Sequence, residues 1–65
     1  MKITVNGEPR EIAASTLEEA LVELGYGAAT VATAVNESFV PIAARAGCRL
    51  SDGDRLEILA PRQGG

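Results

Sequence analysis

Three short segments of the chain alternate apolar and polar or small residues with a period of two. They are residues 2–5 (KITV), 31–36 (VATAVN) and 55–59 (RLEIL). This period is typical of strands that bury one face. A turn at residues 36–38 leads into a further extended segment at 39–41. The pattern therefore predicts strands at each end of the chain and others between them.

The first strand is followed by Asn6-Gly7, a dipeptide that favours a two-residue hairpin turn because both of its residues tolerate positive φ. We expect the return strand at residues 10–13. Pro9 then stands at the beginning of that strand, a position where a missing N–H is tolerated.

Residues 15–25 (STLEEALVELG) carry the one strong helical pattern, which predicts a helix over residues 16–24. Apolar residues recur at i, i+3, i+4 and i+7 starting from Leu17, so one face is apolar and the glutamates point outward. Both Ser15 and Thr16 have a glutamate three residues later, which is the spacing of a capping box. Gly25 supplies a left-handed C-terminal cap.

The remaining segments complete a single α+β domain. Residues 42–47 are alanine-rich and predict a short irregular or helical turn, and residues 51–54 (SDGD) predict a turn before the last strand. The compact arrangement is a mixed sheet of four to five strands, with the first and last strands adjacent and one main helix packed on one face. We expect residues 1–60 to form this domain and residues 61–65 to form a flexible tail ending in Gly-Gly.

Composition limits what such a domain can do. The chain has 65 residues, 46% of them hydrophobic, with Tyr26 and Phe39 as its two aromatic residues. A core this small leaves little room for a ligand pocket. The net charge of −3 argues against nucleic acid as a partner. No apolar run approaches the roughly eighteen residues that span a bilayer, and no signal segment precedes residue 2, so we expect no membrane association and a cytoplasmic location.

The residues needed for catalysis are largely missing. The sequence has no histidine and a single cysteine, Cys48, which we interpret as a small core or loop thiol. Residues 52–54 (DGD) lack the other ligands of a calcium loop, and no phosphate-binding glycine loop precedes the helix. We therefore expect neither a metal site nor an enzyme.

The final residues pose a separate question. Residues 61–65 (PRQGG) follow the last predicted strand and end on two glycines. Residues without Cβ can pass through a slot too narrow for any other side chain, and they would present the carboxylate of Gly65 for activation. A frayed terminus explains the same residues equally well.

The order of motifs along the whole chain resembles the ThiS family, the ubiquitin-like β-grasp sulfur carriers of thiamine biosynthesis. Its most specific parts are residues 35–41 (VNESFVP), 52–55 (DGDR) and 61–65 (PRQGG). Family members often have a basic residue after the "VP" and a tryptophan three residues later, where this chain has Ile42 and Arg45. These departures concern details of partner docking.

The resemblance implies a cycle centred on Gly65, with Gln63 and Gly64 giving the active site of a partner access to it. An adenylyltransferase of the ubiquitin-activating type would use ATP and Mg to form an acyl-adenylate. Sulfur from a cysteine desulfurase or a related donor would displace AMP and leave a thiocarboxylate. Thiazole synthase would then take the sulfur. The carrier itself would bind no cofactor.

Three alternatives remain open at the level of the sequence. The small subunit of molybdopterin synthase shares the fold, the ending and the activated state, but it donates sulfur to another enzyme. A ubiquitin-like modifier would form isopeptide bonds with lysines. A plain interaction module would use the fold without any chemistry at its C-terminus.

Overall fold

The computed structural model describes residues 1–61, and along the chain its first feature is the predicted hairpin. Strand β1 (Lys2–Val5) pairs antiparallel with β2 (Glu8–Glu11). The turn between them has positive φ at both residues, 51° at Asn6 and 86° at Gly7. The hairpin is therefore built on the turn that the sequence predicts.

The predicted bounds of the return strand, residues 10–13, are wrong by two residues. A two-residue turn leaves Glu8 directly opposite Val5, so pairing begins immediately after the turn. Pro9 consequently lies inside β2, opposite Thr4. Hydrogen-bonded and non-hydrogen-bonded pairs alternate away from the turn, so the nitrogen of Pro9 faces the open edge, where no ladder bond is lost.

Helix α1 (Leu17–Glu23) begins at the second of the two possible caps. Thr16 is the N-cap, and its Oγ1 accepts a hydrogen bond from the backbone N–H of Glu19 at 3.2 Å. After the helix, Gly25 has a φ of 95°, the left-handed conformation expected of it. The predicted helix is confirmed, with Thr16 and Leu24 as its flanking caps rather than members.

The second hairpin joins β3 (Ala32–Val35) to β4 (Ser38–Val40). Asn36 and Glu37 form its turn, with φ values of 50° and 71°. The alanine-rich segment that follows is a 3-10 helix, η1 (Ile42–Gly47), which packs beside α1.

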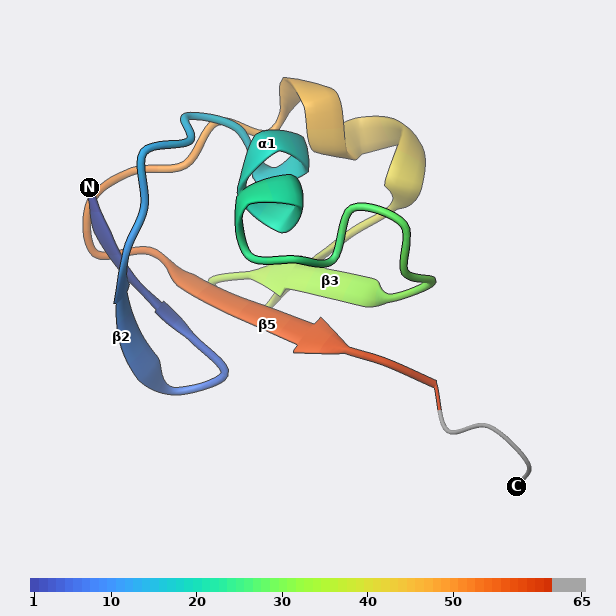
Figure 1. Ribbon diagram of the computed structural model, residues 1–65, viewed down its shortest axis with the longest axis horizontal. Helices are drawn as coiled ribbons and strands as arrows, with labels where there is room; N and C mark the ends of the chain where they lie inside the picture. The colour runs from blue at the N-terminus through green and yellow to red at the C-terminus, as the bar shows by residue number, and fades with distance from the viewer. Residues whose placement is uncertain (62–65) are drawn as a thin grey trace.

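Strand β5 (Arg55–Leu59) completes the sheet from a central position. The strand order is β2-β1-β5-β3-β4, with β5 parallel to β1 and antiparallel to β3. The predicted pairing of the first and last strands is thus confirmed. Figure 1 shows α1 and η1 on one side of the sheet, while no helix of residues 1–61 lies on the other side.

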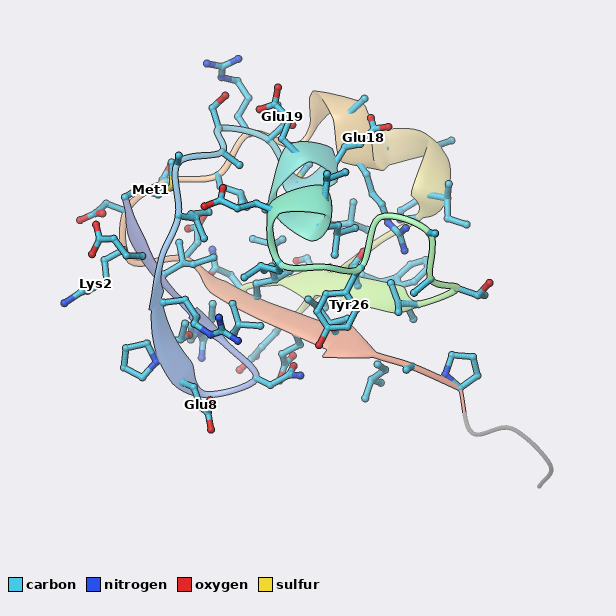
Figure 2. All side chains as sticks on the ribbon, in the orientation of Figure 1. Met1, Lys2, Glu8, Glu18, Glu19 and Tyr26 are labelled. Atoms are coloured by element: carbon cyan, nitrogen blue, oxygen red, sulfur yellow. The ribbon has the colours of Figure 1, made fainter. Side chains whose placement is uncertain are left out.

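The core lies between α1 and the facing side of the sheet. Strand β1, helix α1 and strand β5 all contribute to it. Ile3, Leu17 and Ala20 have at most 1% of their surface exposed. Leu24, predicted to share the buried helix face, is only partly buried at the edge of this cluster. Glu18 and Glu19 point away from the sheet (Figure 2). The buried hydrophobic residues are Ile3, Val5, Ile12, Leu17, Ala20, Leu21, Val31, Leu50, Leu56 and Ile58.

Candidate functional site

The residues predicted to carry the chemistry follow the central strand in the sequence. Beyond Leu59, the chain continues through Ala60 and Pro61, both exposed and outside any strand. Gln63, Gly64 and Gly65 lie outside the described residues. The structure therefore defines the root of the predicted tail and the surface around it.

That root is placed by the alternation of β5. Leu56 and Ile58 are buried, with 1% and 4% of their surface exposed, and they face α1. Leu59 points to the opposite, uncovered face and is 72% exposed. A single exposed aliphatic residue is common on protein surfaces, so the significance of Leu59 depends on its neighbours.

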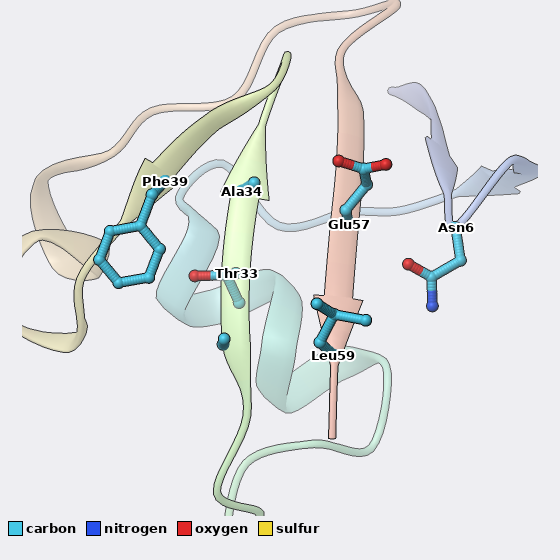
Figure 3. A pocket seen from close by; sticks show the side chains of 7 residues that line it. Asn6, Thr33, Ala34, Phe39, Glu57 and Leu59 are labelled. Atoms are coloured by element: carbon cyan, nitrogen blue, oxygen red, sulfur yellow. The ribbon is translucent and has the colours of Figure 1, made fainter. Parts of the chain in front are cut away.

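A second large apolar side chain lies on the same face. Phe39 of β4 is 69% exposed, and it pairs with Ala34 of β3, which in turn pairs with Glu57 of β5. A shallow hollow of about 210 Å³ lies among these residues and Leu59. Figure 3 shows Phe39 and Leu59 on either side of β3, with Glu57 and Asn6 next to them.

The hollow is smaller than the roughly 300–1,000 Å³ of a typical small-molecule site. It is wide open to solvent and has mostly apolar walls, which suits one or two side chains of a protein partner. A second open groove, of about 470 Å³, runs beside Ala60 and Pro61 and shares Ala32 and Leu59 with the hollow. The two form one continuous apolar surface that ends at the root of the tail. We call this surface, formed by Ala32, Ala34, Phe39, Leu59, Ala60 and Pro61, the outer patch.

The acidic residues of α1 have structural roles that the sequence only partly predicts. Glu19 accepts hydrogen bonds from the backbone N–H and hydroxyl of Ser15, both at 3.2 Å, and these bonds hold the pKa of its carboxyl below the ordinary value of 4.5. Glu23 is exposed, in agreement with its predicted outward position, and it also accepts bonds from the backbone N–H groups of Ala13 and Ala14 at about 3.0 and 2.9 Å. These bonds were not predicted, because they join the helix to the loop that precedes it.

Other candidate chemical groups also have structural places. Cys48 is half-buried against the core at the end of η1, as predicted for a structural thiol. The turn at residues 51–54 is closed by a bond from the Ser51 N–H to Asp54 Oδ2 at 2.8 Å. Among residues 1–61, no three His, Cys, Asp or Glu side chains come together as a metal site, and no helix is long and apolar enough to cross a membrane.

Arg45 occupies the position where the resemblance leads one to expect tryptophan, and it points inward. Its Nε donates to Thr33 Oγ1 at 3.2 Å and its Nη2 donates to the carbonyl of Val31 at 2.6 Å. The Thr33 hydroxyl in turn donates to the carbonyl of Val40 at 2.9 Å. Arg45 thus ties η1 to β3 from the helix side, and this departure from the family pattern leaves the outer patch unaltered.

Within residues 1–61 these features define a small ubiquitin-like domain, with a five-stranded mixed sheet, one main helix and an exposed apolar patch, and the sequence beyond its central strand ends on two glycines. A sequence model of the ThiS family matches residues 3–65. The chain belongs to the ThiS family.

Individual relatives agree with this assignment. The chain is 38% identical over 63 residues to the sulfur carrier protein ThiS of Thermus thermophilus, a match that covers 97% of this chain and 98% of that protein. The crystal structure of the thiamine biosynthesis protein ThiS from Geobacter metallireducens superposes with a TM-score of 0.84 at 29% identity, over the full length of both chains. The predicted β-grasp fold is thereby confirmed.

A third relative is larger. The chain is 44% identical over 66 residues to a thiazole synthase of Paramagnetospirillum magneticum, a match that covers 100% of this chain but 20% of that protein. The chain therefore spans about a fifth of this relative, in which a ThiS-like segment and the rest of a thiazole synthase share one polypeptide.

Proposed function

We propose that this protein is the sulfur carrier of thiamine biosynthesis and that Gly65 is the residue that carries the sulfur. The observation that supports this most directly is the family match, which extends over the glycine-rich ending as far as residue 65. The outer patch gives the carrier role physical support, because a partner can bind this apolar surface while the tail enters the active site of that partner.

The reaction proceeds in two steps at the Gly65 carboxylate. A carboxylate oxygen attacks the α-phosphorus of Mg-ATP in an adenylyltransferase of the ubiquitin-activating type, and pyrophosphate leaves. Sulfide then attacks the acyl carbon, AMP leaves, and the product is a thiocarboxylate. Where a cysteine desulfurase or a related donor supplies the sulfur as a persulfide, the same attack gives an acyl disulfide, and a thiol reductant cleaves its S–S bond to release the thiocarboxylate. ATP and Mg belong to the activating enzyme, and the carrier is its protein co-substrate.

Thiazole synthase is the proposed recipient of the sulfur. The larger relative supports this choice, since its single polypeptide combines a ThiS-like segment with a thiazole synthase. Transfer returns Gly65 to the carboxylate, ready for another cycle. Gln63 and Gly64 lead to Gly65, and Gly64 passes through the narrowest part of the approach, since glycine backbone fits where a side chain would clash. The cytoplasmic location stays a prediction.

The test is to incubate the protein with the adenylating enzyme, Mg-ATP and sodium sulfide, and to measure its intact mass. We expect a gain equal to the mass difference between sulfur and oxygen, placed on Gly65 by peptide mapping. Branched conjugates on lysines would instead identify a protein modifier, and an unchanged mass would identify an interaction module. Delivery of the sulfur to the large subunit of molybdopterin synthase, and not to thiazole synthase, would overturn the proposed recipient.

Two variants serve as controls. Deletion of Gly64 and Gly65 should abolish the mass gain and leave the melting temperature within a degree or two. Gly65→Ala should fail mainly at adenylation, because the added methyl group meets a site shaped for glycine. Activation of Gly65→Ala at the normal rate would contradict this steric explanation while leaving the carrier role intact.

A further inference from the structure

The side chain of Asn6 binds both backbone groups of one residue in the central strand. Its Oδ1 accepts a hydrogen bond from the N–H of Ile58 at 2.8 Å, and its Nδ2 donates to the carbonyl of Ile58 at 3.1 Å. The backbone N–H of Asn6 donates to the carbonyl of Leu56 at 2.9 Å. The side-chain amide therefore occupies the place that the next peptide group of β1 would take in a parallel ladder. Figure 3 shows it reaching toward β5.

The side-chain amide takes the place of a backbone peptide group because β1 ends before β5 does. The chain turns away at Asn6, and the backbone pairing between β1 and β5 reaches only as far as Leu56. On its other side, β5 stays paired with β3 up to Leu59. Ile58 is 4% exposed, so without Asn6 its peptide groups would lack a partner at the border of the core. Asn6 thus holds the last part of β5 from the β1 side.

Asn36, in the turn of the second hairpin, binds the other end of β5 in a related way, although its Nδ2 donates to Asp54 Oδ1 at 3.0 Å and not to the strand. Its Oδ1 accepts a hydrogen bond from the N–H of Arg55 at 3.0 Å, while its own N–H donates to the carbonyl of Arg55 at 2.8 Å. Both asparagines have positive φ, and both extend a ladder onto β5. They differ in location: Arg55 is the first residue of β5, whereas Ile58 lies three residues before Pro61.

We propose that Asn6 is a positioning residue for the reactions of Gly65. By fixing β5 at Ile58, it sets the direction in which the chain leaves the sheet next to the outer patch. A partner that binds the outer patch then meets a tail whose root is already aligned. Without the amide, the end of β5 is held only by β3, and ordering it becomes part of each catalytic cycle. This inference rests on the proposed function.

The test compares Asn6→Gly with Asn36→Gly. Glycine accepts the positive φ of either turn, so both hairpins should persist while each variant loses one side-chain amide. Amide hydrogen exchange should accelerate at Ile58 in Asn6→Gly and at Arg55 in Asn36→Gly. Adenylation is then measured with the adenylating enzyme and Mg-ATP, below the melting temperature of both variants.

We expect kcat at saturating carrier to fall about tenfold for Asn6→Gly and less than twofold for Asn36→Gly, with KM little changed in both. The kcat of Asn6→Asp, which keeps the acceptor but loses the donor, should lie between those of the wild-type protein and Asn6→Gly. Equal kcat values for the two glycine variants, a change confined to KM, or unaltered exchange at Ile58 would each overturn the inference. If the wild-type protein is not adenylated at all, the proposed function falls and takes this inference with it.

Discussion

The two faces of the sheet use similar residues for opposite purposes. Leu56 and Leu59 lie three positions apart in β5, yet 1% of one and 72% of the other is exposed. The inner face packs against α1 and stabilises the fold by removing apolar area from water. The apolar residues of the outer face stay exposed and add little to this stabilisation. The position of a residue in the pleat, more than its chemical type, thus decides whether it is buried in the core or available to a partner.

The largest expected effect on stability comes from truncating a buried side chain of the inner face. Leu56→Ala should lower the free energy of unfolding by about 2–5 kcal/mol, because it leaves a cavity where the side chain is almost fully buried. Leu59→Ala, the matched change on the same strand, should change it by less than about 0.5 kcal/mol. Urea denaturation measures both. Similar losses for the two variants would remove the distinction between the faces.

The reciprocal effect should appear in partner binding. Phe39→Ala and Leu59→Ala each remove an exposed apolar side chain from the outer patch, so each should weaken binding to the adenylating enzyme by about tenfold. Val22→Ala is the control, since Val22 is 65% exposed on α1, away from the outer patch. Titration calorimetry gives the affinities. An equal loss for Val22→Ala would show that partners do not distinguish the faces.

A smaller effect is expected where the inner face is polar. Thr33 is 2% exposed, and its hydroxyl connects the Val40 carbonyl to Arg45. Thr33→Val keeps the shape but leaves both partners without this bond, so it should destabilise by about 1–2 kcal/mol. Arg45→Ala removes a bond to the same hydroxyl, so the double variant should lose less than the sum of the two single changes. Strict additivity in urea denaturation would contradict the coupling.

The smallest effect lies at the start of α1, outside the sheet. The Ser15 bonds lower the pKa of Glu19 from its ordinary 4.5 in the folded state. The folded protein therefore binds fewer protons than the unfolded chain in this range, and the stabilisation is present above pH 4.5 and lost as the pH falls through the lowered value. Glu19→Gln should reduce this part of the pH dependence of the melting temperature. Glu18→Gln, which keeps the Ser15 bonds, should not.

Local signals in the sequence predicted the local structure well. The cap at Thr16 and the positive φ at Asn6 depend on neighbouring residues, and both are confirmed. The inward and outward positions of β5 also follow from alternation, so Leu59 could have been identified as an outward apolar residue from its spacing to Ile58. The exposure of Phe39 required the register of the second hairpin, which places it opposite Ala34 on the outer side.

Long-range contacts of polar side chains were not predictable in the same way. The bonds between Asn6 and Ile58 join residues 52 positions apart, and nothing near Asn6 in the sequence indicates them. The bonds that the exposed Glu23 accepts from Ala13 and Ala14 were likewise not indicated by the sequence around it. In each case the side chain satisfies backbone groups that become unpaired only once the topology is known.

The central position of β5 has a consequence during protein synthesis. This strand is made after the other four, yet it lies between β1 and β3, so the two hairpins cannot join in one sheet until β5 itself has been synthesised. Folding must therefore wait for contacts between residues distant in sequence, which makes it slower than assembly from neighbouring segments. A chain interrupted before Arg55 would lack the middle of its sheet and expose its hairpins to proteases. Synthesis of β5 is therefore the step that unites the two hairpins in one sheet.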